Sequence, residues 1–390
     1  MKKETTIGVI GAGTMGSGIA QIASTFGATV YVYDAFPEQL KKSEQGLRSI
    51  LNRQVEKERM TQKEVDGILS RIHFRDHLND FSSCTIVFEA IIEDLQAKQD
   101  QFARLEAIVD KSCILATNTS SLSIASISSS LSHPGRFLGI HFFNPAPLMK
   151  LVEIIPGIAT GQDVVSQARE LINNWEKVTV LASDTPGFIV NRVARPFYGE
   201  ALRIYEEGIA DPATIDWAMK ELGGFRMGPF ELMDLIGHDV NYKVTETVFK
   251  EFFYDPRFKP SFAQKRLVES GRLGRKTGRG FYEYGDDANN PEPVRDTALG
   301  QKILNRILAM LINEACDAVF MGVATPDDVD LAMTNGVNYP KGLLAWGEEI
   351  GLQTVLDWMS NLQVEYREDR YRPNPLLKRK VRNGETFFSS

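Results

Sequence analysis

A glycine-rich turn near the N-terminus constrains the fold more than any other feature of the sequence. The apolar run at residues 5–10, TTIGVI, leads into GAGTMG, which places Gly11, Gly13 and Gly16 in G-x-G-x-x-G spacing, and a run with helical periodicity follows. The first glycine of such a turn bends the chain tightly, the second lets the backbone approach a pyrophosphate, and the third lets the helix pack close to the strand. The pattern predicts a dinucleotide-binding unit, and a glycine turn without a ligand is the alternative.

The second predicted strand indicates which dinucleotide binds. The stretch ATVYVYD ends at Asp34, 18 residues beyond Gly16. A carboxylate at about this distance binds the adenosine ribose hydroxyls in dinucleotide-binding folds. Because a carboxylate there repels a 2′-phosphate, we expect the cofactor to be NAD and not NADP.

Further strands follow at the spacing of an α/β protein. TIVFEAI, CILATNT, RFLGIHFF and KVTVLAS occupy residues 85–91, 113–119, 136–143 and 177–183, with helical stretches such as residues 93–109 between them. We therefore predict an α/β fold in which residues 1–185 form a doubly wound, mostly parallel, Rossmann-like sheet. Ligands bind at the carboxyl ends of the strands in such sheets, and the polar residues at those ends are Glu89, Glu93, Asn118–Ser121 and His141–Asn144.

A histidine lies within one of these strands. His141 is part of LGIHFFNP, and Glu153 follows twelve residues later in LMKLVEIIPG. A buried histidine satisfied by backbone groups is the commoner explanation for an isolated case, whereas a position at a strand end favours a function. The two side chains can meet if PAPLMK turns and LVEIIP runs back as a neighbouring strand.

One segment does not fit a plain dinucleotide-binding unit. Residues 37–72 form a long polar helical pattern that breaks near Arg59, where Thr61 is predicted to cap a second helix with Glu64 as its capping-box partner. We expect a helical hairpin that projects from the sheet and carries Lys41, Lys42, Arg48, Arg53, Lys57 and Arg59. The hairpin is either a solvated helical face or a basic arm that binds a phosphorylated substrate tail.

The composition excludes several classes of protein. The 390-residue chain has a net charge of −7 and no basic stripe, which argues against nucleic-acid binding. Its apolar runs are too short to span a bilayer, and the N-terminal residues show no apolar signal segment. The three cysteines, Cys84, Cys113 and Cys316, form no metal or redox motif, so we expect no metal site and a cytoplasmic location.

Five motifs occur together in a recognisable order. They are GAGTMGSGIA, NTSSLSI, GIHFFNPAPLMKLVE, DTPGFIVNRV and GRKTGRGFYEY, within residues 5–284. In this order and spacing the chain resembles the L-3-hydroxyacyl-CoA dehydrogenase family, which includes the 3-hydroxybutyryl-CoA dehydrogenases. The resemblance implies an NAD-dependent, reversible oxidation of (S)-3-hydroxyacyl-CoA to 3-oxoacyl-CoA, with an acyl-CoA as the substrate.

The resemblance also implies roles for matched residues. His141 corresponds to the catalytic base and Glu153 to the carboxylate that orients it, while Ser120 and Asn191 correspond to residues that hydrogen-bond the substrate. The positions predicted to contact the cofactor are Gly11, Gly13, Thr14, Met15, Gly16, Asp34, Glu93, Lys98, Asn118, Ser120, Asn144 and Lys276. The hairpin is loosely patterned in the family, and substrate contacts are predicted there at Arg53, Lys57 and Arg59.

The chemistry of the reaction explains the His–Glu pair. Hydride leaves C3 only if the hydroxyl proton leaves with it, so a base with a pKa near the working pH is needed, and histidine, at about 6.5, is the natural choice. A carboxylate on the other ring nitrogen fixes the tautomer and stabilises the imidazolium.

After residue 185 the pattern becomes helical. Residues 186–284 are predicted to form an all-α domain, with N-cap signals at Asp211 and Asp239, and residues 285–296 an acidic linker. A shift of 114 positions aligns NRVARPFYGEA with NRILAMLINEA, which predicts that residues 297–390 duplicate the helical domain. The second copy ends in NGETFFSS, which we interpret as lacking an equivalent of GRKTGRGFYEY. Its Asn305, aligned with Asn191, is interpreted as structural.

The duplication bears on the oligomeric state. The resemblance implies that single-copy members of the family form dimers through the helical domain. We therefore expect the second copy to pack on the first in the place of a partner subunit. A monomeric pseudo-dimer and a homodimer formed through another surface are both open.

Two other functions are alternatives. A dehydrogenase of small polar 3-hydroxy acids or carnitine would use a similar His–Glu pair without coenzyme A, although the hairpin and the full HFFNPAPLMKLVE segment favour the thioester. A non-catalytic NAD-binding protein is expected to have lost one of Ser120, His141, Glu153 or Asn191, and all four are present. Acyl chain length, pathway and physiological direction cannot be predicted from the sequence.

Overall fold

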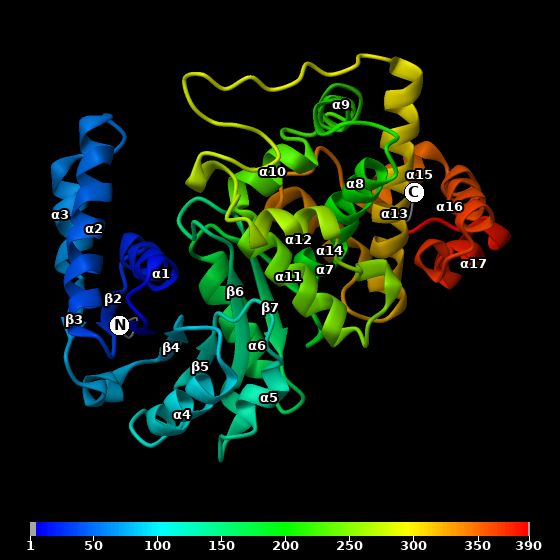
Figure 1. The fold of residues 1–390 in the computed structure, drawn as a ribbon. Helices are drawn as coiled ribbons and strands as arrows, with labels where there is room; N and C mark the ends of the chain where they lie inside the picture. Colours follow the sequence, from blue (N-terminus) through cyan, green and yellow to red (C-terminus); the bar gives the residue numbers. More distant parts are fainter. Residues whose placement is uncertain (1–4, 389–390) are drawn as a thin grey trace. The chain divides into compact units, whose positions relative to one another are not determined.

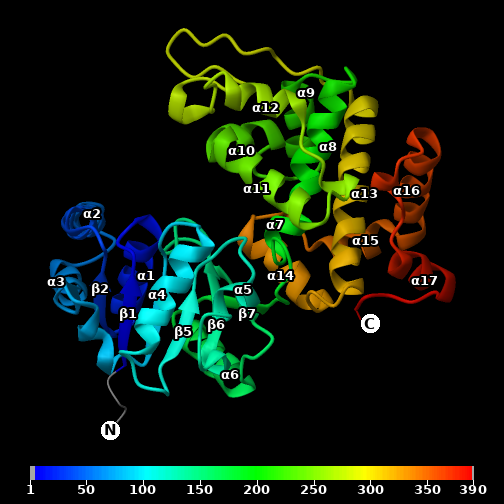
Figure 2. The same cartoon turned by 60° about the horizontal axis from the view of Figure 1, so that its bottom comes forward.

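The computed structural model describes residues 5–388. The chain divides into two compact units, Met1–Thr185 and Pro186–Ser390. The first contains the whole β-sheet, and the second consists of helices and loops (Figures 1 and 2). Each unit is described separately below.

One eight-stranded sheet forms the centre of the first unit, in the order β3-β2-β1-β4-β5-β6-β7-β8. Its pairings are parallel except for the antiparallel pair β6–β7. The order reverses between β1 and β4, as in a doubly wound fold, so the predicted fold class is confirmed. The strands are β1 Thr6–Ile10, β2 Thr29–Tyr33, β3 Ile72–Arg75, β4 Ile86–Glu89, β5 Ile114–Thr117, β6 Phe137–Phe142, β7 Leu151–Pro156 and β8 Val178–Leu181.

Helices cover the sheet and bury its apolar strands. Every residue of β4, β5 and β6 is buried, as expected for central strands with both faces covered. The core includes Ile7, Val30, Phe88 and Leu138 from four strands. The helices of this unit are α1 Thr14–Thr25, α2 Pro37–Glu56, α3 Gln62–Ser70, α4 Leu95–Glu106, α5 Ile124–Ser128 and α6 Gln162–Asn173.

The predicted helical hairpin is formed by α2 and α3, which lie side by side (Figure 1). Its capping box is also confirmed, because Thr61 Oγ1 accepts from the Glu64 amide at 3.3 Å while Glu64 Oε2 accepts from the Thr61 amide at 2.7 Å. The structure adds strand β3, which the sequence pattern did not predict. This short strand starts at Ile72, where we expected only the end of the helical pattern, and pairs with the edge of β2.

The second unit is helical. Asp211 caps α9 as predicted, accepting from the Thr214 amide at 2.8 Å. The prediction of an N-cap at Asp239 is wrong, because α11 begins at His238 and Gly237 takes the N-cap position. The helices are α7 Val190–Val193, α8 Arg195–Glu206, α9 Pro212–Trp217, α10 Pro229–Ile236, α11 His238–Glu251, α12 Phe262–Glu269, α13 Thr297–Phe320, α14 Pro326–Gly336, α15 Leu343–Ile350, α16 Leu352–Tyr366 and α17 Pro375–Asn383.

Positions 114 residues apart make the same contacts in the two halves of this unit. Asp216 accepts from the first amides of α10, those of Phe230 and Glu231, at 2.9 Å each. Asp330 accepts from the first amides of α15, those of Leu344 and Ala345, at 2.8 and 2.9 Å. A carboxylate at a helix N-terminus satisfies amides that have no partner within the helix. The shared cap supports the interpretation of a duplicated helical domain.

The two halves exchange ion pairs where α7 and α8 pack on α13. Arg192 donates to Glu314 at 2.8 Å, and its counterpart Arg306 donates to Glu200, the counterpart of Glu314, at 2.6 Å. The contacts are therefore reciprocal, as across a two-fold axis. Both carboxylates are buried, at 0% and 2% exposure for Glu200 and Glu314.

The C-terminal segment corrects one interpretation of the sequence. In the first half, Asp234 accepts from the amides of Phe281 and Tyr282, both at 3.0 Å. In the second half, Glu348, which is the aligned counterpart of Asp234, accepts from the amides of Phe387 and Phe388. NGETFFSS therefore does contain an equivalent of the GFYEY segment, and it was missed because the shared interaction uses backbone amides.

The linker at residues 285–296 contains no helix or strand (Figure 1). It is nevertheless tied to the first half, because Asn290 exchanges hydrogen bonds with the Glu283 backbone and the Val294 amide donates to Thr214 Oγ1 at 2.9 Å. Asp296 then caps α13.

Candidate active site

The glycine turn has the geometry of a phosphate cradle. Gly11 has a φ of 99°, in the region that favours glycine, and a Cβ on Gly16 would lie 1.8 Å from the Gly11 carbonyl oxygen. Gly13 is exposed, and nothing lies within 4 Å of where its Cβ would be. As the N-cap of α1, Gly13 has no side chain to accept from the first helical amides. The turn therefore fits the pyrophosphate of a dinucleotide.

Asp34 is fixed at the end of β2 beside this turn. Its Oδ2 accepts from the Ala12 amide at 2.7 Å and its Oδ1 from the Phe36 amide at 2.9 Å. Each oxygen keeps a second acceptor site, so the carboxylate can still bind ribose hydroxyls. Thr14 and Met15, also predicted cofactor contacts, begin α1 next to the turn.

His141 and Glu153 face each other in the sheet. They are a directly opposed pair in the antiparallel register of β6 and β7, which brings residues twelve positions apart together. His141 Nδ1 lies 2.7 Å from Glu153 Oε2, with the histidine 6% exposed and the glutamate fully buried. The ring of Phe143 lies beside the imidazole, with the centroids 4.5 Å apart.

Glu93 organises the segment that carries Ser120. Its Oε1 accepts from Thr119 Oγ1 at 2.7 Å, from the Ser120 amide at 2.9 Å and from the Ser121 amide at 3.2 Å. Burial acts to raise the pKa of Glu93, but Lys98 and these donors outweigh it, so the net shift is downward. The carboxylate is therefore held in its charged form.

Three other predicted residues of the first unit have defined positions. Asn118 follows β5, and its Oδ1 accepts from the Phe142 amide at 2.8 Å, which ties the ends of β5 and β6 together. Asn144 is exposed just beyond β6. Lys98, in contrast, is 1% exposed and forms ion pairs with Glu89 and Glu93 at 2.6 and 3.3 Å.

Two predicted site residues belong to the second unit. Asn191 is half-buried in the short helix α7. Lys276 forms an ion pair with Asp239, with nitrogen–oxygen distances of 2.5 and 2.7 Å. Their roles toward substrate and cofactor stay predictions.

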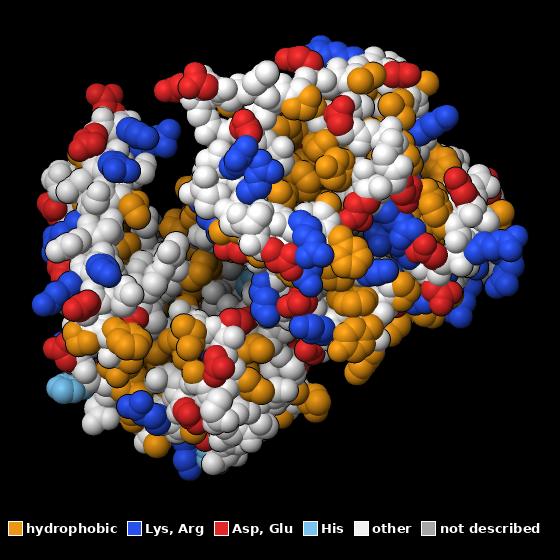
Figure 3. Space-filling model, viewed as in Figure 1, with side chains coloured by type: hydrophobic (Ala, Val, Ile, Leu, Met, Phe, Trp, Pro, Cys, Tyr) orange, Lys and Arg blue, Asp and Glu red, His pale blue; other side chains and the backbone are white. Residues whose placement is uncertain are grey.

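The hairpin cations are exposed, and acidic residues accompany them. Arg53, Lys57 and Arg59 all lie near the turn between α2 and α3. Arg48 is paired with Glu44 at 3.0 Å. Figure 3 shows basic and acidic side chains mixed over this hairpin, so its charge is less uniform than a basic arm implies.

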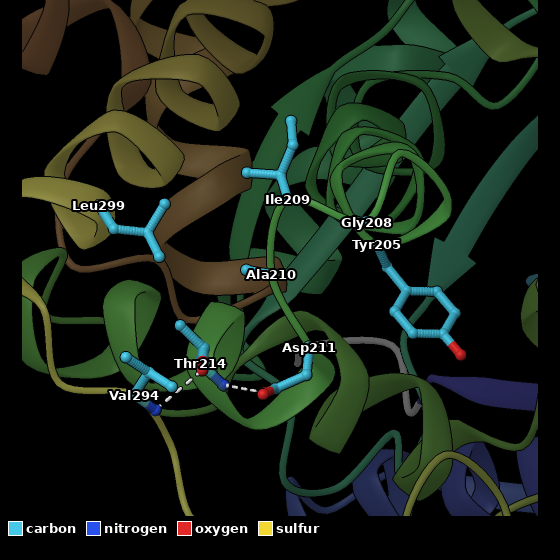
Figure 4. A pocket seen from close by; sticks show the side chains of 8 residues that line it. All are labelled: Tyr205, Gly208, Ile209, Ala210, Asp211, Thr214, Val294 and Leu299. Carbon is cyan, nitrogen blue, oxygen red and sulfur yellow. Dashed lines mark hydrogen bonds between the residues drawn. The ribbon is translucent and has the colours of Figure 1, made fainter.

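A separate pocket lies in the helical unit. Its volume is about 420 Å³, and it lies between the end of α8, the start of α9 and the start of α13 (Figure 4). Its lining is mainly apolar and includes Tyr205, Ile209, Val294 and Leu299. No predicted site residue lines it.

Comparison with known proteins identifies the family. The model of the 3-hydroxyacyl-CoA dehydrogenase NAD-binding domain matches residues 6–185, and that of the C-terminal domain of the same enzymes matches residues 187–284 and 303–387. The chain belongs to the 3-hydroxyacyl-CoA dehydrogenase family. It is accordingly an NAD-dependent oxidoreductase acting on 3-hydroxyacyl-CoA, and its C-terminal region matches the family in two segments.

Individual relatives extend this result. The chain is 38% identical to 3-hydroxyadipyl-CoA dehydrogenase of Escherichia coli K12, over 96% of this chain and 97% of that protein. It is 40% identical to a probable 3-hydroxybutyryl-CoA dehydrogenase of Deinococcus radiodurans, over 71% of this chain and 99% of the relative. The crystal structure of 3-hydroxybutyryl-CoA dehydrogenase from E. coli K12 superposes with a TM-score of 0.92 at 37% identity, covering 98% of this chain and 99% of that one.

The structure adds polar residues around the site that sequence analysis did not assign. Glu89, noted only for its place at a strand end, is the main partner of Lys98. Lys177 donates to the carbonyls of Ala146 and Met149, both at 2.8 Å, and so holds the loop between β6 and β7. Burial lowers the pKa of Lys177 to about 8. Sequence analysis missed Lys177 because any residue type supplies a backbone carbonyl, so these contacts produce no recognisable sequence pattern.

Two further observations concern the whole described chain. No helix within residues 5–388 is long and apolar enough to cross a membrane. The three cysteines are buried and unpaired, and burial raises the pKa of Cys84 and of Cys113 to about 12. These two thiols are therefore poor nucleophiles at neutral pH.

Proposed function

We propose that this dehydrogenase oxidises short (S)-3-hydroxyacyl-CoA thioesters with His141 as the general base and Glu153 as the carboxylate that orients it. The observation that carries the proposal is the buried 2.7 Å contact between His141 Nδ1 and Glu153 Oε2. With Nδ1 donating to Glu153, Nε2 is the ring nitrogen that accepts the hydroxyl proton. Glu153 then stabilises the imidazolium that forms.

The other matched residues position the reactants. Bound NAD supplies the hydride acceptor. The amides at the start of α1 hold its pyrophosphate and Asp34 its adenosine ribose, while Ser120 and Asn191 hydrogen-bond the substrate oxygen at C3. Lys98, Asn118, Asn144 and Lys276 complete the proposed cofactor contacts.

The acyl group is proposed to be short. One E. coli relative is named for a 3-hydroxyadipyl thioester and another for a 3-hydroxybutyryl thioester. The coenzyme A tail is proposed to bind along the hairpin at Arg53, Lys57 and Arg59, which are exposed cations.

A comparison of a thioester with its free acid tests this proposal. NADH oxidation is followed at 340 nm with acetoacetyl-CoA and, in parallel, with acetoacetate. The expected result is rapid turnover of the thioester and a kcat/KM at least about a thousandfold lower for the free acid, because the coenzyme A contacts contribute binding energy only to the thioester. Preference for acetoacetate would contradict the proposal and favour a polar hydroxy acid as the substrate.

We further propose a cytoplasmic monomer in which the second helical copy occupies the place of a partner subunit. Its support is the reciprocal pairing of α7 and α8 with α13, through Arg192–Glu314 and Arg306–Glu200. Light scattering after size exclusion tests the oligomeric state, with an expected mass near the 43.6 kDa of one chain. A mass of two chains would contradict the monomer.

A further inference from the structure

Glu89 is a buried carboxylate to which the proposed mechanism assigns no role. It ends strand β4, is fully buried, and accepts from Lys98 Nζ at 2.6 Å, Thr117 Oγ1 at 2.7 Å and the Ile91 amide at 2.7 Å. A buried carboxylate is costly unless its oxygens are paired, and these three donors satisfy it. Because Lys98 belongs to α4 and Thr117 to β5, Glu89 joins three elements at the carboxyl edge of the sheet.

Lys98 connects Glu89 to Glu93. Its ammonium group lies between the two carboxylates, 2.6 Å from Glu89 and 3.3 Å from Glu93. Glu89 is fully buried, whereas the Glu93 side chain is 36% exposed. The shorter, buried contact therefore fixes the position of the ammonium, and the ammonium in turn fixes Glu93 at the surface.

Glu93, held in place by Lys98, in turn fixes the segment that carries Ser120. Besides the amides of Ser120 and Ser121, the hydroxyls of both serines lie within reach of Glu93 Oε1, at 3.3 and 3.1 Å. One carboxylate oxygen therefore accepts hydrogen bonds from several groups of the turn that follows Asn118. A displacement of Glu93 would move all of these groups together.

The topology indicates which half of the cofactor faces this cluster. Asp34, the proposed ribose ligand, ends β2 on one side of β1, while β4 and β5 lie on the other side. With the pyrophosphate at the glycine turn after β1, the nicotinamide half of a bound NAD would lie toward the ends of β4 and β5. The cluster of Glu89, Lys98 and Glu93 belongs to that half.

We propose that Glu89 is a positioning residue for the nicotinamide half of the cofactor. Through Lys98 and Glu93 it fixes the turn Asn118–Ser121, although it does not itself reach the reactants. The inference rests on the proposed function, because it assumes the roles given there to Lys98 and Ser120. It adds a buried residue that acts through them.

Two ligands separate positioning from general damage to the fold. NADH contains the nicotinamide, whereas ADP-ribose contains only the adenosine, the pyrophosphate and the second ribose. For Glu89→Gln in the full chain, the dissociation constant of NADH is expected to rise about tenfold and that of ADP-ribose to stay within about twofold. Thr117→Val is the matched control, since it removes a hydrogen bond to the same carboxylate but keeps the ion pair, and both constants should change less than about threefold.

Equal weakening of NADH and ADP-ribose would overturn the inference, as would unchanged NADH binding. If Glu89→Gln does not fold, Glu89→Asp keeps the buried charge beside Lys98 but shortens the side chain, and it allows the same comparison. Turnover of acetoacetyl-CoA by the wild type is measured separately. Its absence would count against the proposed function, whereas the ratio of the two dissociation constants tests Glu89.

Discussion

His141 and Glu153 show how a sheet can build a reactive pair from distant residues. In antiparallel strands, opposed side chains lie on the same face, so a tight connection between β6 and β7 is enough to place the imidazole against the carboxylate. Burial of Glu153 strengthens its interaction with the ring, because the low local dielectric weakens the screening of charge. Kinetics distinguish a catalytic pair from a core histidine that is satisfied by a structural partner.

We expect Glu153→Gln to reduce kcat by roughly 10² to 10⁴, because the amide can no longer stabilise the imidazolium or enforce the tautomer. NADH affinity should be unchanged, since Glu153 lies in β7, away from the glycine turn and Asp34. Steady-state kinetics and NADH titration measure the two effects. A kcat within about twofold of the wild type would mean that the pair is only structural.

At the scale of elements, the sequence predicted those whose pattern is long or chemically distinctive. The glycine turn and the hairpin with its Thr61 capping box follow from local periodicity and capping rules. The return of β7 beside β6 was stated only as the condition under which His141 and Glu153 meet, and the structure fulfils it. Strand β3 was missed because its apolar–polar alternation covers only four residues, IHFR, directly after a long helical pattern. The docking of Phe387 and Phe388 on Glu348 was missed because it depends on backbone amides.

The same limit applies to the candidate site. The sequence pointed to His141 and Glu153 through their side-chain chemistry, whereas Ser120 was assigned through the family resemblance. It could not show that Lys98 is buried between two carboxylates, since that depends on how α4 packs beside β4 and β5. Residues that act through other residues leave only weak signals in a single sequence.

The hairpin gives a prediction about salt and coenzyme A. Replacing Arg53, Lys57 and Arg59 together by Gln should raise KM for acetoacetyl-CoA about tenfold at low ionic strength and reduce its dependence on salt, because exposed charges attract the phosphates over a screened range. The triple variant Lys41→Gln, Lys42→Gln, Arg48→Gln removes the same charge from the same hairpin and serves as the control. Similar KM values for the two triple variants would contradict a specific role for the turn.

The helix caps give a prediction about pH. Burial, only partly offset by hydrogen bonds from Phe230, Tyr282 and Glu231, raises the pKa of Asp216 to about 7, from an ordinary value of 3.8. Between those values the folded state binds a proton that the unfolded state has lost, so the contribution of Asp216 to stability falls as pH rises from about 4 to about 7. The free energy of unfolding of the wild type minus that of Asp216→Asn should therefore decrease by roughly 3 kcal/mol over this range and then level off.

Urea unfolding at several pH values measures this difference. The Asn variant cannot ionise, so it provides the reference at every pH. A difference that instead increases with pH would show that the hydrogen bonds to the α10 amides outweigh burial and lower the pKa of Asp216.

At the scale of the whole molecule, the chain combines a dinucleotide-binding unit with a helical unit made of two related halves. The halves share the caps at Asp216 and Asp330 and exchange the ion pairs of Glu200 and Glu314. The family model matches both segments, and a relative in D. radiodurans corresponds to only 71% of this chain over nearly its entire length. These facts support a duplication of the helical domain within one chain.

The reciprocal pairs should dominate the stability of the helical unit. Glu200→Gln leaves Arg306 and Arg370 without their buried carboxylate, and we expect it to lower the free energy of unfolding by about 3 kcal/mol or more. Glu314→Gln should lower the free energy of unfolding by a similar amount, because it removes the carboxylate that pairs with Arg192 and Arg257. Glu283→Gln, which breaks an exposed pair with Arg279, is the control and should cost less than about 1 kcal/mol. Equal effects in all three would contradict the account.

The most direct test of the central claim is NADH oxidation by acetoacetyl-CoA, measured side by side for the wild type and His141→Ala. The account predicts clear turnover by the wild type and a kcat lower by about three orders of magnitude in the variant, with NADH binding retained, because only the base has been removed. A variant that turns over within about tenfold of the wild type would show that His141 is not the base.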